Sequence, residues 1–151
     1  MRIVLLEPEI PQNTGSIARL AAATATSLDL IGPLGFLLED RYLKRAGLDY
    51  WPWVDLTVHE SWERYLAEPR AGRLLGFSAR STVSYTRCEY REDDRLLFGK
   101  ESKGLGAEVL DMLGEDRVFT IPMATTHVRS LNLSNAVSIV AYEARRQLGL
   151  A

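Results

Sequence analysis

The chain has 151 residues, of which 46% are hydrophobic and 25% charged, and this composition predicts one globular domain over residues 1–151. A formal net charge of −2 excludes an overall basic surface and leaves only local patches for a nucleic acid. No apolar run is long enough to cross a bilayer, so we expect no membrane partner.

The single cysteine, Cys88, cannot form an intrachain disulfide, and the start of the chain is too short and too polar for a signal-peptide core. Both features favour a cytoplasmic protein. No cluster of cysteine and histidine has the spacing of metal ligands, so we expect no metal site.

Short apolar runs alternate with amphipathic stretches in the first half of the chain. The apolar runs predict strands over residues 2–6, 28–31 and 53–58. Helical spacing predicts helices over residues 13–25, with Asn13 as the N-cap, and over residues 39–46 and 61–68.

The second half continues this order, with strands predicted over residues 73–77, 95–98 and 117–121 and a helix over residues 106–113. The last helix, over residues 133–148, carries one apolar face that should pack on the sheet. Repeated alternation of strand and helix predicts an α/β fold with a largely parallel sheet. Ligands of such sheets gather at the carboxyl ends of the strands.

Three of these strand ends carry small or polar residues directly after an apolar run. They lie at residues 76–78, 99–106 and 121–135. Glycine at such positions lets a ligand approach the main chain closely, and the neighbouring apolar side chains form pocket walls. Each glycine alone is more typical of an ordinary turn or helix end, and the spacing matches neither a dinucleotide site nor a P-loop.

Two helix starts are rich in polar residues. Asn132 or Ser134 should cap the last helix, and the remaining polar groups there exceed what one cap requires. Asn13 and the free N–H groups of the first helix could hold a phosphate. Arg19, about two turns further on, is by itself more typical of a surface residue.

Three segments resemble the motifs of the SPOUT-class RNA 2′-O-methyltransferases, and the resemblance covers nearly the whole chain. They are residues 7–15 (EPEIPQNTG), 98–105 (FGKESKGL) and 121–137, which ends in RSLNLSNAV. Residues 47–50 and 142–149 are similar to one branch of the family, the small tRNA wobble-nucleotide 2′-O-methyltransferases.

The resemblance implies an α/β fold whose C-terminal part is tied into a deep trefoil knot, with S-adenosylmethionine bound by the knot loops. It assigns cofactor contacts to six residues: Phe77, Gly99, Ile121 and Ser130, with Met123 and Leu131 close by. The reaction yields S-adenosyl-L-homocysteine and needs no metal, because the sulfonium is already electrophilic.

The resemblance also implies a homodimer with an RNA site built across two chains. Active-site roles fall on Arg19, Glu101, Asn132 and Tyr142. Arg19 would reach the cofactor of the partner subunit and orient a phosphate or the ribose. Glu101 would anchor the second-motif loop or its arginine partners rather than act as a base. Tyr142 would serve equally well as a packed residue at the dimer interface.

The expected function is methylation of the ribose 2′-hydroxyl of the tRNA wobble nucleotide, a cytidine or modified uridine at position 34. Two alternatives stay open: methylation of another tRNA position or of ribosomal RNA, and a non-catalytic RNA-binding module. Lys100 stands where the family commonly has proline and Lys103 where it commonly has arginine. Lys100 should make its loop less rigid.

Overall fold

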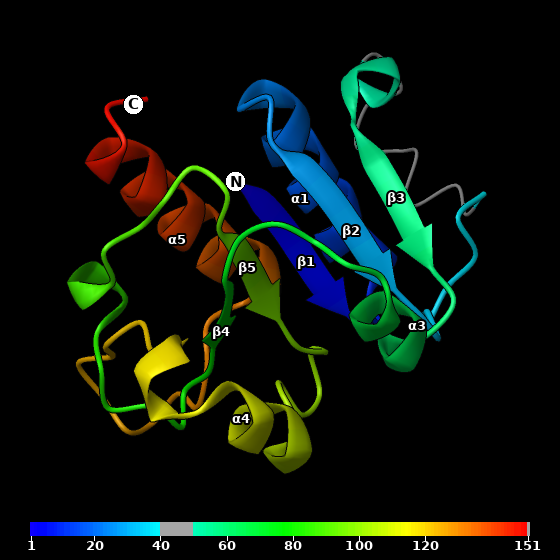
Figure 1. Cartoon of the computed structure of the whole chain (residues 1–151). Coiled ribbons are helices and arrows are strands. Elements are labelled where there is room, and N and C mark those ends of the chain that lie inside the picture. The colour runs from blue at the N-terminus through cyan, green and yellow to red at the C-terminus, as the bar shows by residue number, and fades with distance from the viewer. Residues whose placement is uncertain (40–49, 151) are drawn as a thin grey trace.

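In the computed structural model, which describes residues 1–39 and 50–150, six parallel strands form one sheet in the order β3-β2-β1-β5-β4-β6 (Figure 1). This confirms the predicted α/β fold. The strands are β1 (Arg2–Leu6), β2 (Ser27–Ile31), β3 (Leu56–His59), β4 (Leu74–Phe77), β5 (Arg95–Phe98) and β6 (Val118–Phe119).

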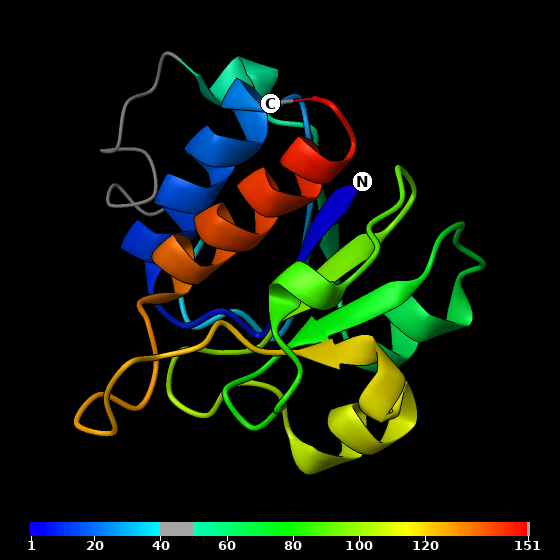
Figure 2. The ribbon, with the colours of Figure 1, turned by 90° about the vertical axis from the view of Figure 1, so that its left-hand side faces the viewer.

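Helices cover both faces of this sheet. On one face α1 (Pro11–Ala23) and α5 (Leu133–Gln147) lie side by side (Figure 2). On the other face lie α3 (Trp62–Ala67) and α4 (Ala107–Leu113). The described residues also include three short 3₁₀ helices: η1 (Trp51–Trp53), η2 (Tyr85–Arg87) and η3 (Glu115–Arg117).

The central strand β1 has apolar side chains on both faces of the sheet, so both faces must be packed against helices. Successive side chains of a strand point to opposite faces, so Ile3 and Leu5 pack with α1 and α5, whereas Val4 and Leu6 pack with α3 and α4. All four side chains are buried. A run that is apolar at every position is typical of a parallel strand covered on both sides.

The prediction for the last helix is confirmed. Val137, Val140 and Ala144 of α5 are fully buried against the sheet. The Asn132 side chain caps the helix, because its Oδ1 accepts hydrogen bonds from the backbone N–H of Ser134 at 2.9 Å and of Asn135 at 3.4 Å.

The predicted start of the first helix is wrong. Helix α1 begins at Pro11, and its N-cap Ile10 offers no side-chain cap. Proline suits the first helical position, because its fixed φ is already helical and its missing N–H would have no partner there. Asn13 therefore lies within the first turn, where it is buried and bonded to other segments.

Two strand predictions differ from the structure in extent. Strand β3 begins only at Leu56, because residues 51–53 form η1, and β6 ends at Phe119. The short helix predicted over residues 39–46 lies, apart from Glu39, outside the described residues. The trefoil knot stays a prediction.

Along the described parts of the chain, no helix has both the length and the apolar character needed to span a membrane.

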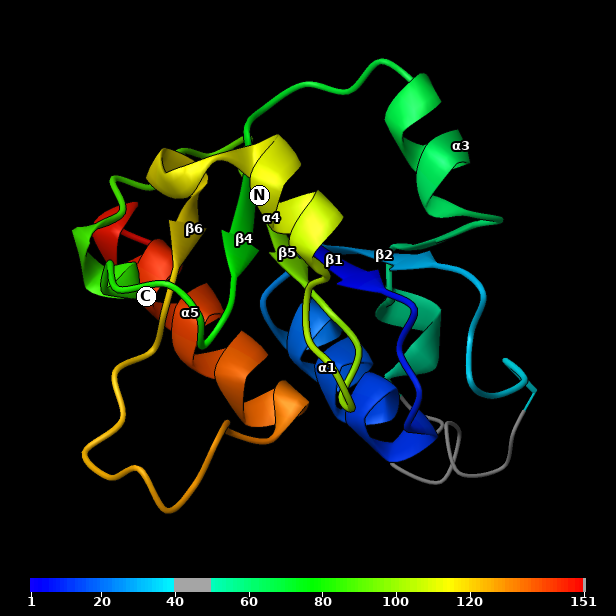
Figure 3. The same cartoon turned by 90° about the horizontal axis from the view of Figure 1, so that it is seen from below.

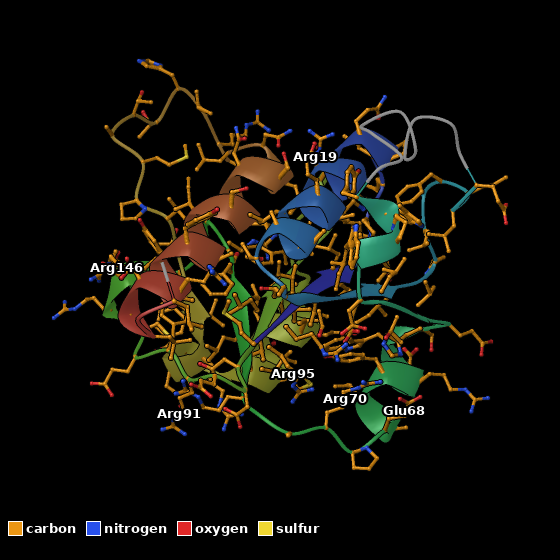
Figure 4. The ribbon with its side chains drawn as sticks, turned by 90° about the horizontal axis from the view of Figure 1, so that it is seen from above. Arg19, Glu68, Arg70, Arg91, Arg95 and Arg146 are labelled. Atoms are coloured by element: carbon orange, nitrogen blue, oxygen red, sulfur yellow. The ribbon has the colours of Figure 1, made fainter. Side chains whose placement is uncertain are left out.

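A buried polar cluster on the α3 face fastens the edge of the sheet. Asp29 of β2 is fully buried, forms an ion pair with Arg2 and lies 3.6 Å from Nε2 of His59. Arg70 and Arg95 both lie over the Tyr65 ring, on the opposite side of the sheet from α1 (Figure 4). The hydrophobic periodicity of the sequence does not predict this cluster, because the residues around Asp29 come from five separate segments of the chain.

An ion pair in the last turn of α5 should make the stability of the fold depend on pH. The Glu143 carboxylate accepts hydrogen bonds from Nε and Nη2 of Arg146 at 2.8 and 2.9 Å and from Nε2 of Gln147 at 2.8 Å. These bonds favour the charged form and lower the pKa of Glu143 to about 2 from its ordinary value of 4.5.

We expect Glu143→Gln to lower the melting temperature of the protein near pH 7. A lowered folded-state pKa stabilises the protein above the unfolded pKa, and the contribution disappears as the pH falls from about 4.5 through about 2. The melting temperatures of wild type and variant should therefore converge over that range in circular dichroism scans. A gap that stays constant down to pH 2 would contradict this assignment.

Candidate active site

A cavity of about 800 Å³ lies at the carboxyl ends of β4, β5 and β6. The residues that line it belong to the loops after these strands and to the start of α5. Figure 3 shows where these segments lie in the fold. A volume of this size is typical of a small-molecule site, and its position is where parallel sheets bind their ligands. The cavity thus lies at the three strand ends where the sequence predicts the ligand site.

Eight of the ten residues expected at the site line this cavity. They are Phe77, Gly99, Glu101, Ile121, Met123, Ser130, Leu131 and Asn132. Arg19 and Tyr142 are not among the lining residues; Arg19 is exposed on α1, and Tyr142 is half-exposed on α5. One chain thus brings the expected cofactor residues together but leaves two expected active-site residues outside.

Aromatic rings form the floor of the cavity. The rings of Phe77 and Phe98 stack with centroids 5.0 Å apart, and Phe119 packs against Phe77 at 6.2 Å. Phe77 and Phe98 line the cavity, and Ile121 and Leu131 add aliphatic walls above them. The rings themselves are almost fully buried, so they give the cavity an apolar floor with little exposed ring surface.

The loop after β5 folds back tightly on itself at Gly99. The N–H of Gly104 donates to the carbonyl of Lys100 at 2.7 Å, and Gly104 has a φ of 65°, which glycine adopts without strain. A Cβ on Gly99 would lie 2.1 Å from the carbonyl carbon of Gly104. Gly99 is therefore required by the close approach of two backbone segments.

The Glu101 carboxylate joins this loop to the loop after β1. Its Oε2 accepts a hydrogen bond from the N–H of Glu9 at 2.7 Å, and its Oε1 accepts from the N–H of Ile10 at 3.2 Å and from Nδ2 of Asn13 at 3.1 Å. The predicted anchoring role of Glu101 is confirmed. Its partners are backbone groups and an amide.

Asn13 extends the network to the third loop. Its Oδ1 accepts a hydrogen bond from Nδ2 of Asn132 at 2.9 Å, while Asn132 Oδ1 caps α5. Three segments far apart in sequence are thereby fixed around one cavity. Because Glu101 takes the N–H groups of Glu9 and Ile10 and the Asn13 amide, the phosphate site expected at the start of α1 is not supported.

A second connection fastens the same two loops. Glu9 accepts hydrogen bonds from the N–H and the hydroxyl of Ser102, each at 2.9 Å, and these bonds lower the pKa of Glu9. Lys100 forms an ion pair with Glu7, which raises the pKa of Lys100. The side chain and the carbonyl of Lys100 are thus both bonded, and the expectation that Lys100 makes its loop less rigid stays a prediction.

Cationic side chains from three loops line the cavity. They are Arg80, Lys100, Lys103 and Arg129. Arg80 was missed by the sequence analysis, although its position three residues after a buried strand was a signal. His127, in the loop between β6 and α5, is exposed and is not among the lining residues.

Residues 1–142 match the family model described as the SpoU rRNA Methylase family. The chain belongs to this SpoU methylase family. It is 49% identical to the putative tRNA (cytidine(34)-2′-O)-methyltransferase of Synechocystis sp., over 98% of this chain and 97% of the relative. It is 45% identical to the tRNA (cytidine(34)-2′-O)-methyltransferase of Escherichia coli K12, over 99% and 94%.

Solved structures of SpoU methylases share this fold. One from work on 2-OH methylation of C/U34 on tRNA is 54% identical, with a TM-score of 0.91 over 98% of this chain and 90% of its own. The methyltransferase AviRb from Streptomyces viridochromogenes, in complex with AdoMet, is 25% identical, with a TM-score of 0.81 over 98% of this chain and 57% of its own.

The cavity of this SpoU methylase fits an adenosyl cofactor. Apolar side chains such as Phe77, Ile121 and Leu131 line it together with the polar side chains of Ser130 and Asn132, a mixture typical of small-molecule sites. Within residues 1–39 and 50–150, no three side chains of histidine, cysteine, aspartate or glutamate gather as metal ligands would.

We expect Gly99→Ala to weaken binding of S-adenosylmethionine by at least about tenfold, because the new Cβ forces apart the backbone that shapes the cavity. Gly106→Ala is the matched control, since a Cβ there meets no atom within 4 Å. Calorimetric titration of both variants, with melting temperatures to confirm folding, measures the effect. Wild-type affinity in a folded Gly99→Ala protein would overturn the steric argument.

Proposed function

We propose that this chain transfers the methyl group of S-adenosylmethionine to the ribose 2′-hydroxyl of nucleotide 34 of a tRNA, a cytidine or modified uridine. One observation carries the proposal: the three bonded loops enclose an 800 Å³ cavity in a chain that matches tRNA (cytidine(34)-2′-O)-methyltransferases over nearly its whole length. The exposed cations around the cavity suit a polyanionic substrate.

The cavity residues would bind and orient the methyl donor. Phe77, Ile121 and Leu131 would hold the adenosyl part and exclude water, with Ser130 as a polar contact. S-adenosylmethionine supplies, when bound, an electrophilic methyl group on a sulfonium, with a neutral thioether as leaving group. The protein's contribution is then the placement of the attacking hydroxyl and acceptance of its proton.

The bonding of Glu101 limits the roles open to it. Both of its oxygens accept hydrogen bonds from N–H groups, so the carboxylate positions loops and is not placed to take the hydroxyl proton. Asn132 has its Oδ1 committed to the cap of α5 and its Nδ2 to Asn13. A guanidinium stays protonated in proteins, so Arg19 would orient the ribose or a phosphate.

The positions of Arg19 and Tyr142 support action as a homodimer. Neither side chain lines the cavity of its own chain. For Arg19 to act on the ribose, it would come from the partner subunit. Arg80, Lys103 and Arg129, which line the cavity on three different loops, would contact the phosphates that flank the target nucleotide.

Transfer of tritium from labelled S-adenosylmethionine into tRNA tests the proposal. We expect transfer with the wild type and a loss of at least about a hundredfold in Arg19→Ala, with cofactor affinity retained because Arg19 lies outside the cavity. Arg64→Ala, an exposed arginine on the opposite face, is the matched control.

Mass mapping of the labelled tRNA should place the methyl group on nucleotide 34. Methylation elsewhere would favour the alternative RNA substrates. If the protein binds the cofactor but transfers no methyl group to any tRNA, the remaining hypothesis is a non-catalytic RNA-binding module. An active monomer in sedimentation would contradict the role given to Arg19.

A further inference from the structure

Arg19 projects from α1 on the helical side of the molecule (Figure 4). A long, exposed side chain samples many rotamers, and each must be given up before the guanidinium can act at a defined point. Catalysis by positioning is sensitive to such freedom, since small misplacements cost large factors in rate. A neighbour that restrains Arg19 would therefore have a direct role in the reaction.

Tyr50 is such a neighbour. The guanidinium carbon of Arg19 lies 4.9 Å from the centroid of the Tyr50 ring, within the range of a cation–π interaction. A planar guanidinium over an aromatic face is restricted in direction as well as position. The ring therefore limits where the charge of Arg19 can lie.

The hydroxyl of Tyr50 makes a second contact with the same turn of α1. It donates a hydrogen bond to the carbonyl of Gly15 at 2.9 Å. In an α-helix this carbonyl accepts the N–H of the residue four positions later, which is Arg19. Tyr50 thus contacts both the side chain of Arg19 and the backbone turn from which it projects.

Tyr50 is itself held against the body of the protein. It is half-buried against the main core and is the N-cap of η1, where its carbonyl accepts a hydrogen bond from the N–H of Trp53 at 3.0 Å. Its ring also packs at a tilt against Trp51, with centroids 6.5 Å apart. The restraint on Arg19 therefore comes from a fixed point.

We propose that Tyr50 is a positioning residue of methyl transfer, which holds the Arg19 guanidinium ready for the RNA. The inference rests on the function proposed above and on the role given there to Arg19. Tyr50 does not line the cofactor cavity. Its loss should therefore reduce kcat on tRNA and leave the affinity for S-adenosylmethionine unchanged.

Two substitutions separate the ring from the hydroxyl. Tyr50→Phe keeps the ring and loses the bond to Gly15, and we expect kcat within about threefold of wild type. Tyr50→Leu keeps an apolar side chain and loses the ring, and we expect kcat to fall about tenfold with KM for S-adenosylmethionine unchanged. Trp53→Leu, on the exposed side of the same η1, is the matched control.

A double-mutant cycle with Arg19→Ala tests whether Tyr50 acts through Arg19. We expect Tyr50→Leu to have no further effect once Arg19 is absent. An equal loss of kcat in both backgrounds would overturn the proposal. So would a wild-type kcat in a folded Tyr50→Leu protein, or a loss in Tyr50→Phe as large as in Tyr50→Leu.

The NMR signal of the Arg19 Nε–H group separates this inference from the proposed function. We expect a ring-current shift in the wild type and in Tyr50→Phe, and its loss in Tyr50→Leu. Absence of that shift in a wild type that methylates tRNA would overturn the role of Tyr50 alone. A shift in a wild type that methylates no tRNA would overturn the proposed function, and with it any part for Tyr50 in catalysis.

Discussion

The Glu101 carboxylate accepts hydrogen bonds from the backbone of Glu9 and Ile10 and from the amide of Asn13, and Asn13 passes the connection on to Asn132. A charged acceptor bonded to three N–H groups in a half-buried setting is a strong restraint. It fixes the loops after β1 and β5 and the start of α5 around one cavity. The floor of phenylalanine rings comes from the sheet, but the shape of the opening depends on this network.

The elements that pack by local pattern were predictable from the sequence. The apolar face of α5 and its cap Asn132 follow from spacing and residue type within one segment. Asn13 was assigned wrongly because its partner Glu101 lies 88 residues away and the nearer signal, Pro11, sets the helix start. The Asp29 cluster was missed for the same reason, since its partners meet only when the sheet forms.

Spacing alone does not point to a cofactor, an RNA or a dimer, and these expectations came from the family resemblance. The structure adds a division of tasks among the residues named by that resemblance. Glu101 and Asn132 build the cavity, whereas Arg19 lies outside it and contacts Tyr50. In the function proposed above, two kinds of restraint would serve one reaction: a hydrogen-bonded network for the methyl donor and an aromatic contact for the arginine.

The central claim is that the Glu101 network forms the cofactor site, and calorimetric titration of S-adenosylmethionine into Glu101→Gln tests it most directly. In Glu101→Gln, an NH₂ group would replace one of the two carboxylate oxygens. It would face a backbone N–H, so two donors would meet and a hydrogen bond would be lost. The account predicts a loss of affinity of about tenfold or more. Glu108→Gln, exposed on α4, should bind as the wild type does. A folded Glu101→Gln protein with wild-type affinity would contradict the account.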